Sequence, residues 1–325
     1  MNQWTERLLE NAQDYKFQHV FIDKEKVRAT AKNWAKKVFK TPSWRELPNY
    51  PFDDDNLIQF ICITSAIDFC FHSPGTSKKF WTKWRGQKWT GSYAMSACVT
   101  RATEEGIDVL DANFLENISM RRMEAIFNKD SEMPLLSERC AIWQDAGYIL
   151  QHFYDGHFKN LFEESGYRCF NEGAGICERL AYRFSRAFYD GRSLKKNGEN
   201  IPLFFHKKAF LVPLIYYGRA KDSKTLPQIK DTSSLGPLID YQIPRALCHF
   251  GMLAYSKELA KKISKREELP MNSIFEVEIR LASAVVFCMI LEMIENLTAP
   301  QLDYFLWTYA KKIKTPAHIT MCVNY

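Results

Sequence analysis

Three short segments place an ionisable side chain among apolar neighbours, a setting in which burial changes the chemistry of the group. The segment FFHKKA places the basic residues His206, Lys207 and Lys208 directly after an apolar stretch. Asp240 lies in LIDYQIP, just before a helix that Pro244 can begin. Asp303 lies in LDYFLW and is flanked by large hydrophobic side chains. These three segments are the first candidates for a functional site.

Each carboxylate also has a purely structural interpretation. A carboxylate at a helix start accepts hydrogen bonds from free backbone N–H groups and is stabilised by the helix dipole, so it stays ionised. That setting suits Asp240 as a charged catalytic group and equally as a helix cap. A carboxylate among apolar residues, such as Asp303, must be paired, lie in the first turn of a helix or line a pocket. The residues alone leave both interpretations open.

Generic catalytic and cofactor motifs are missing from the sequence. There is no P-loop, dinucleotide-binding glycine motif, zinc-protease histidine motif or nucleophile elbow. His152 and His157 are five residues apart, off the spacing that puts two metal ligands on one helix face. We therefore expect no metal and no cofactor. The net charge of +6, from 44 basic and 38 acidic residues, is mild and favours an anionic ligand or a weak nucleic-acid contact.

The cysteines and the hydropathy pattern indicate the cell compartment in which the protein is expected. The nine cysteines form no CxxC pair, and most lie in apolar stretches, so buried free thiols in a reducing compartment are expected. The first residues are polar, and no signal peptide is expected. The longest strongly apolar stretch, 284–291, is too short to span a membrane. We expect a soluble, cytoplasmic protein with no membrane partner.

Helical patterns dominate the chain, and strand patterns are few and weak. The segment 284–294 is apolar nearly all round, which predicts a central buried helix. The predicted fold is mainly α, a single domain over 1–325, with two helical lobes around a cleft as one arrangement. Helices are predicted over 23–38, 54–67, 93–105, 119–127, 134–156, 176–187, 206–217, 244–265, 273–296 and 300–312, strands over 201–205 and 319–323, and loops over 73–79, 190–200 and 221–237.

The same segments belong to a longer ordered pattern. It consists of VFIDKEKV, IDFCF, RATEEGI, PLLSERCAI, FFHKKA, LIDYQIPRALCHFGMLAYS, EVEIRLAS, LDYFLW and PAHITMCVNY, and it runs from residue 20 to residue 325. In this order, and especially in DYxxPxxLxxxGxLxYS followed by EVEIR and LDYxLW, the chain resembles the queuosine salvage family, the queuosine 5'-phosphate N-glycosylase/hydrolases.

The resemblance implies a fold, an activity and a set of site residues. The fold would be mainly helical and similar to helical DNA-repair glycosylases. The activity would be hydrolysis of the N-glycosidic bond of queuosine 5'-monophosphate, which releases queuine for salvage into tRNA. The implied catalytic residue is Asp240, and the implied substrate-binding residues are Lys207, Asp303, Phe69, Phe71 and Tyr241.

The sequence departs from the family pattern at a few positions. His72 stands where tryptophan is common, and GSYA at 91–94 replaces a stretch resembling GYWS. Phe210 and Arg245 stand where glutamine is usual. The first two departures lie in the half of the chain that is expected to shape the base pocket.

The chemistry of the implied reaction fits these side chains. N-ribosyl hydrolysis passes through an oxocarbenium-like state, which an ionised Asp240 can stabilise while it directs a water or attacks the anomeric carbon. A 7-deazaguanine has carbon at position 7, so help to the leaving base must come through other ring atoms. Asp303 could accept two parallel hydrogen bonds from the guanine-like edge. Lys207 would suit the 5'-phosphate or a ribose hydroxyl.

Two other function classes compete with this one. A glycosylase acting on a modified base within tRNA or DNA shares the chemistry but needs a basic groove, and the mild net charge argues against it. A non-catalytic nucleotide-binding protein could keep the same carboxylates as helix caps. The expected partner is a small-molecule nucleotide, and no stable nucleic-acid complex is expected.

Overall fold

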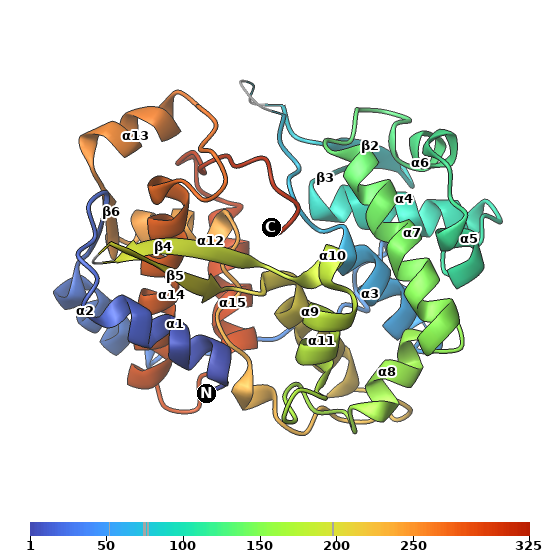
Figure 1. Cartoon of the computed structure of the whole chain (residues 1–325), viewed down its shortest axis with the longest axis horizontal. Coiled ribbons are helices and arrows are strands. Elements are labelled where there is room, and N and C mark those ends of the chain that lie inside the picture. The colour runs from blue at the N-terminus through green and yellow to red at the C-terminus, as the bar shows by residue number, and fades with distance from the viewer. Residues whose placement is uncertain (52, 74–75, 77, 197) are drawn as a thin grey trace.

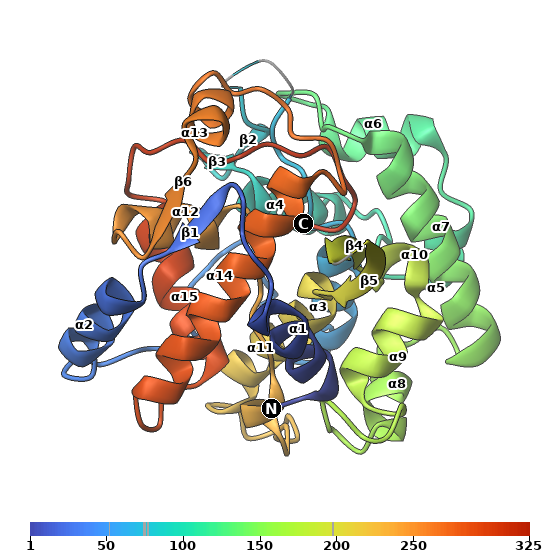
Figure 2. The same cartoon turned by 60° about the vertical axis from the view of Figure 1, so that its left-hand side comes forward.

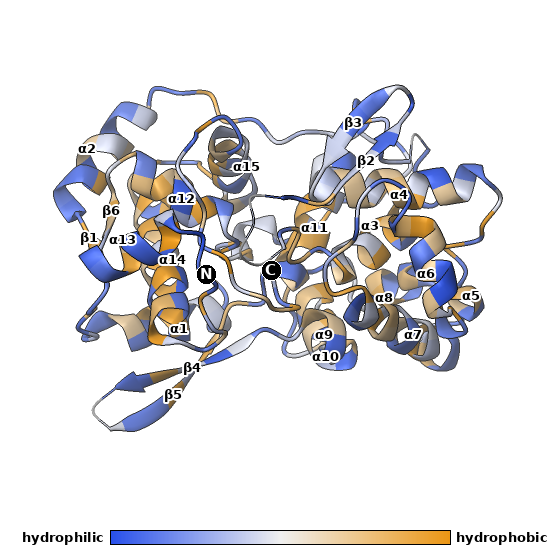
Figure 3. Ribbon diagram, turned by 90° about the horizontal axis from the view of Figure 1, so that it is seen from above, coloured by the Kyte–Doolittle hydropathy of each residue, from blue (hydrophilic) through white to orange (hydrophobic). Residues whose placement is uncertain are grey.

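Helix α14 (Ile274–Met293) lies at the centre of one half of the molecule and is buried on most of its faces. The computed structural model describes residues 1–51, 53–73, 76, 78–196 and 198–325. Ser273 caps the helix by accepting a hydrogen bond from the backbone N–H of Glu276. Hydrophobic residues run along most of α14 (Figure 3). The prediction of a central buried helix over 284–294 is therefore confirmed.

The helices form two groups that lie side by side (Figures 1 and 2). The first group surrounds α14 and contains α1 (Gln3–Gln13), α2 (Lys24–Trp34), α12 (Gln242–His249), α13 (Lys257–Ser264) and α15 (Ala299–Ala310). The second contains α3 (Leu57–Ala66), α4 (Ser92–Glu104), α5 (Ala112–Glu116), α6 (Met120–Phe127), α7 (Leu136–Phe153), α8 (Phe158–Glu164), α9 (Ile176–Arg183), α10 (Ser185–Phe188) and α11 (Lys207–Ala220). The mainly α prediction is confirmed.

Within the described ranges, the strands form three small antiparallel pairs. The strands β1 (Val20–Ile22) and β6 (Leu253–Tyr255) pair across most of the sequence. Two hairpins are local: β2 (Trp81–Trp84) with β3 (Gln87–Thr90), and β4 (Gly191–Lys196) with β5 (Glu199–Phe204). A short 3₁₀ helix, η1 (Thr232–Ser234), precedes α12.

The sequence prediction was wrong at several boundaries. The helix predicted over 244–265 is broken after His249, because the chain turns at Gly251 with φ of 73° and enters β6. Ser256 then caps α13 through the N–H of Leu259. Most of the loop predicted over 190–200 is the hairpin β4–β5, and residue 197 lies outside the described residues. Residues 74, 75 and 77 of the loop predicted over 73–79 also lie outside them.

The strand predictions had different outcomes. The strand predicted over 201–205 is confirmed as part of β5. The one predicted over 319–323 forms no strand, although Ile319 makes an isolated bridge to Glu268. Helix α1 had not been predicted, because the polar first residues hide an amphipathic pattern that buries Trp4 and Leu8.

A single hydrophobic cluster extends through both groups of helices, from Trp4 to Ala310. We propose on this basis that 1–325 form one domain. All nine cysteines are free, and eight of them are buried, as predicted. Among the described residues, no helix combines the length and the hydrophobicity that a membrane crossing requires.

Gly147 provides a test of the packing between α7 and α5. An ordinary glycine in a helix interior is improved by alanine. A Cβ at Gly147, however, would lie 2.3 Å from the backbone N of Glu116 and 2.6 Å from the carbonyl oxygen of Ala112. We expect Gly147→Ala to lower the free energy of unfolding by about 1–3 kcal/mol, because backbone atoms cannot give way without a helix shift.

Chemical denaturation measures this change. Lys159→Ala, on the exposed face of α8, serves as the control and should stay within about 0.5 kcal/mol of wild type. A Gly147→Ala protein as stable as wild type would contradict the close contact of α5 and α7.

Candidate active site

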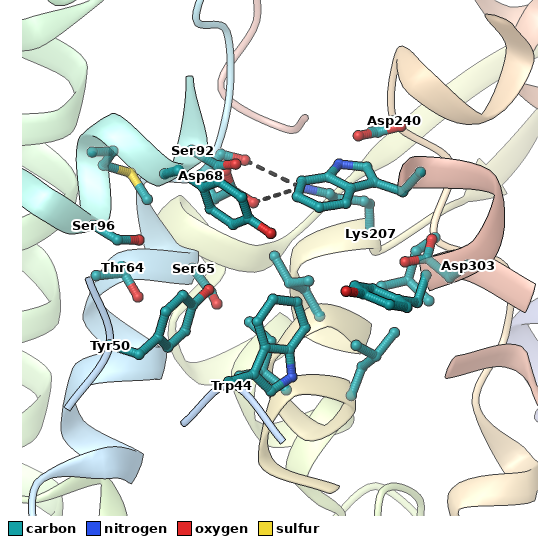
Figure 4. Close-up of a pocket in the computed structure, with 18 residues that line it drawn as sticks. Trp44, Tyr50, Thr64, Ser65, Asp68, Ser92, Ser96, Lys207, Asp240 and Asp303 are labelled. Atoms are coloured by element: carbon teal, nitrogen blue, oxygen red, sulfur yellow. Dashed lines mark hydrogen bonds and ion pairs between the residues drawn. The ribbon is translucent and has the colours of Figure 1, made fainter. Parts of the chain in front are cut away.

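A cavity of about 650 Å³, measured with its mouth, lies where the two groups of helices meet (Figure 4). One wall comes from α3, α4 and α11, and the opposite wall from α15 and the segment before α12. Its lining includes the carboxylates Asp68, Asp240 and Asp303, the ammonium of Lys207, and the aromatic side chains of Trp44, Tyr50, Tyr93, Tyr304 and Trp307.

Asp240 is both a helix-start residue and a cavity residue. Its Oδ1 accepts hydrogen bonds from the backbone N–H groups of Gln242 at 2.7 Å and Ile243 at 3.1 Å. Its Oδ2 accepts none from the described residues. Burial raises the pKa of Asp240, while the charge of Lys207 and the two N–H donors oppose that shift. The capping interpretation is thus correct in part, since one oxygen holds the helix start and the other is available in the cavity.

Lys207 is the first residue of α11 and follows His206, which has a left-handed backbone with φ of 46°. Its Nζ lies 2.9 Å from Oδ2 of Asp68 (Figure 4). Burial lowers the pKa of Lys207, but the carboxylates of Asp68 and Asp240 outweigh it, and the net shift is upward. The lysine is therefore a fixed cation. Sequence reasoning missed Asp68, although its place in the apolar run IDFCF was a signal of the same kind as that at Asp303.

Asp303 lies in the second turn of α15 and is no helix cap. Thr298 occupies the cap position, and its backbone N–H donates a hydrogen bond to Oε1 of Gln301. The carboxyl of Asp303 lines the cavity and hydrogen-bonds to no residue in the described part of the chain. Burial and then the nearby charge of Asp240 raise its pKa well above the usual range. The alternative of a first-turn cap was wrong, and the alternative of a pocket residue is confirmed.

The remaining predicted residues line a second, smaller cavity of about 240 Å³. Phe69, Phe71 and Tyr241 form part of its wall, together with Tyr325. The Phe69 ring is fully buried, with the Arg139 guanidinium 4.1 Å and the Lys208 ammonium 4.7 Å from its centroid. The two cavities share Asp68, Ser92, Lys207, Asp240 and Trp307. All six predicted site residues are thus brought together around one ion pair.

Two buried polar atoms of the main cavity lack a hydrogen-bond partner among the described residues. Within the described ranges, neither Nε1 of Trp44 nor Oγ of Ser65 has a hydrogen-bond partner. Buried polar groups without partners are uncommon in folded proteins, and in a cavity they are suited to bind a ligand's polar atoms. Sequence reasoning missed both, because Trp44 lies in an irregular segment and Ser65 in an otherwise apolar helix.

Comparison with known proteins decides the family. The sequence profile of the family described as queuosine salvage protein matches residues 49–325. The chain belongs to the queuosine salvage protein family. It is 27% identical to a queuosine 5'-phosphate N-glycosylase/hydrolase of Sphaerobacter thermophilus, over 99% of this chain and 96% of the relative. Relatives of the same name are 28% identical in Mus musculus, over 97% and 96% of the two chains, and 23% identical in Schizosaccharomyces pombe, over 87% and 85%.

The EVEIR segment is one of those that carried the family resemblance. Its arginine contacts the segments that lead to two of the site residues. Arg280 of α14 forms a two-bond ion pair with Asp190, at 2.9 and 2.7 Å. It also donates to the carbonyl oxygen of Ile239, the residue before Asp240, at 3.2 Å. Its guanidinium lies 4.1 Å from the ring centroid of Phe205, two residues before Lys207. The buried side chain of Arg280 thereby contacts the chain just before Asp240 and just before Lys207.

A second buried arginine holds the turn that carries Asp68. Arg139 of α7 donates to the carbonyl oxygens of Ile67, Phe69 and Cys70. Lys208 supports the same turn through a 2.8 Å hydrogen bond to the carbonyl oxygen of Ala66. The family segments IDFCF, PLLSERCAI and FFHKKA therefore meet in space around the Asp68–Lys207 ion pair. Among the described residues, no group of three or more His, Cys, Asp or Glu side chains is placed to hold a metal ion.

Proposed function

We propose that this chain hydrolyses the N-glycosidic bond of queuosine 5'-phosphate, so that water adds to the anomeric carbon and queuine leaves with a proton. The observation that carries the proposal is Asp240, held by two backbone N–H groups with its second oxygen available in the cavity. The relatives that match nearly the whole chain bear the name of this activity.

The surplus of negative charge in the cavity suits an oxocarbenium-like transition state. Asp68, Asp240 and Asp303 line the cavity with Lys207 as the cation among them. We propose that ionised Asp240 stabilises the developing sugar cation and orients the attacking water. The carboxylate of Asp68, ion-paired with Lys207 at 2.9 Å, adds to the negative potential of the cavity, where electrostatic interactions are stronger than in bulk water.

For Asp303 we propose the role of proton donor to the leaving base. Its raised pKa favours the neutral carboxyl, whereas Asp240 has hydrogen-bond donors and a lysine that favour its charged form. Two carboxyls whose surroundings separate their pKa values are suited to act as acid and base. This role replaces the acceptor role expected from the sequence, which required an ionised Asp303. Trp44 Nε1 and Ser65 Oγ then remain to bind polar atoms of the base.

Incubation with queuosine 5'-monophosphate, queuosine and GMP tests the proposal, with free base detected by mass spectrometry. We expect queuine from the nucleotide and no guanine from GMP. The nucleoside should react about 10- to 100-fold more slowly in kcat/KM, because it lacks a charge-assisted phosphate contact. Failure of the wild-type protein to release queuine from either queuosine substrate would contradict the proposed function.

A further inference from the structure

The charges on the cavity lining raise the question of where a phosphate dianion would bind. The sequence suggested Lys207 for this role, yet its ammonium is already paired with Asp68 at 2.9 Å. The carboxylates of Asp240 and Asp303 also act on that ammonium. A phosphate placed there would meet the negative charges of Asp68 and Asp240 beside the neutral carboxyl proposed for Asp303, and like charges repel. The phosphate contacts must therefore come from other cations beside the cavity.

Lys79 is the first such cation. Its backbone bridges to His72, and its side chain crosses Gly91. A Cβ added to Gly91 would lie 2.4 Å from Cε and 2.8 Å from Nζ of Lys79, so the ammonium lies directly over this glycine. Gly91 immediately precedes Ser92 and Tyr93, both of which line the main cavity. Lys79 itself lines a neighbouring surface pocket, and its ammonium lies beside the main cavity at Gly91.

Lys311 is the second cation and comes from the end of α15. Its Nζ lies 3.7 Å from the ring centroid of Tyr93 and 3.2 Å from that of Trp307. These two rings pack edge to face, with centroids 5.5 Å apart, and both line the cavity. The ammonium is thus held over two aromatic rings of the cavity wall, and one of them, Tyr93, is two residues after Gly91.

Neither ammonium forms a hydrogen bond or an ion pair with any residue that the structure describes. The pKa of each ammonium is nevertheless shifted by charged groups of the site. Desolvation by the surrounding protein and then the charge of Lys79 lower the pKa of Lys311 to about 7, against the opposing effect of Asp240 and Asp68. Burial also lowers the pKa of Lys79, with Asp240 and Asp68 raising it and Arg245 lowering it. Two such cations beside a cavity repel each other. An anion bound between them would remove this repulsion and accept a charge-assisted hydrogen bond from each ammonium.

We propose that Lys79 and Lys311 together bind the 5'-phosphate of the substrate at the edge of the cavity, next to Gly91 and Trp307. This inference rests on the proposed function and assigns the residues that distinguish nucleotide from nucleoside. The carboxylates then face the ribose and the base, and the lysines face the phosphate. The Lys207–Asp68 pair is left to the sugar, in keeping with the ribose contact that the sequence allowed.

The test compares two substrates across single and double variants, Lys79→Gln and Lys311→Gln. For queuosine 5'-monophosphate, we expect kcat/KM to fall about 10- to 100-fold for each variant, mainly through KM. For queuosine, which has no phosphate, the rate should stay within about twofold of wild type. Lys311→Arg, which keeps the charge, should restore most of the nucleotide activity. The matched controls are Lys78→Gln and Lys312→Gln, exposed lysines that adjoin the two tested residues in the sequence, and they should change neither rate.

The opposite results are equally clear. Equal losses on both substrates would mean that the lysines only support the aromatic wall, and no loss on the nucleotide would place the phosphate elsewhere; either result overturns the inference. If wild-type protein released no queuine at all, the proposed function would fail separately. Calorimetry with ribose 5-phosphate then decides the lysine site alone: binding that is lost in the double variant and kept in the controls supports it, and binding unchanged in the double variant overturns it.

Discussion

Replacement of Asp240 by asparagine is expected to lower kcat by about 10²- to 10⁴-fold and to leave the protein folded. Asparagine caps a helix about as well as aspartate, so the hydrogen bonds from Gln242 and Ile243 can be kept. The charge that would stabilise the sugar cation is lost. Substrate affinity should change little, because the charge acts in the transition state more than in the ground state.

Single-turnover assays measure the predicted loss of rate, and thermal melting of the same preparation shows whether the variant remains folded. Asp111→Asn is the matched control, because Asp111 caps α5 through the N–H of Phe114 and lies outside both cavities of the site. It should retain both its activity and its melting temperature. A folded Asp240→Asn protein that releases queuine at nearly the normal rate would leave Asp240 as a structural cap and nothing more.

The second large effect concerns Asp303 and the pH dependence of kcat. Burial and Asp240 raise the pKa of Asp303 well above its usual range, so the carboxyl keeps its proton until the pH passes that raised value. As a proton donor it is active below its pKa, and kcat should fall as the pH rises through it. Asp240 must be ionised, and because its pKa is also raised, kcat should fall on the acid side at a pH above 3.8. The profile is expected to be bell-shaped, with apparent values that belong to the coupled pair.

Asp303→Asn separates the two limbs. The amide can donate a hydrogen bond but cannot transfer a proton, so kcat should drop about 10²-fold and the alkaline limb should disappear, while the acid limb remains. The profile is measured in kcat, because Lys311, with a pKa of about 7, would act on phosphate binding and hence on KM. Asp145→Asn, at a carboxyl whose pKa is also raised by burial but on α7 away from the site, should leave both limbs unchanged. An alkaline limb that survives in Asp303→Asn would assign the proton donor to another group.

Prediction from the sequence succeeded where the local pattern contains the information. Lys207, Asp240 and Asp303 each stand out as a charge in an apolar setting, and all three line the cavity. Asp68 carries the same signal but was missed, because its importance depends on a lysine 139 residues away. Trp44 was missed for another reason: it belongs to no helix or strand, and a periodic pattern gives no information about a residue in an irregular segment.

The fold shows the same division between local and distant information. The buried part of helix α14 could be predicted because the segment 284–294 is apolar nearly all round, which already implies burial. The break after His249 could not, because β6 exists only through its pairing with β1, with Leu253 opposite Ile22. Local helix propensity favoured a continuous helix there. The pairing of β6 with the distant strand β1 outweighs that propensity.

The ion pair between Lys207 and Asp68 also bears on the order in which the molecule folds. The two residues are 139 positions apart, and the Asp190–Arg280 pair behind the site joins residues 90 positions apart. Contacts between such distant segments have a larger entropic cost of loop closure than contacts within a helix. Until they close, each buried charge lacks its counter-ion and the carboxylates are not aligned. A chain in which these contacts have not formed would therefore have no aligned site and no hydrolytic activity.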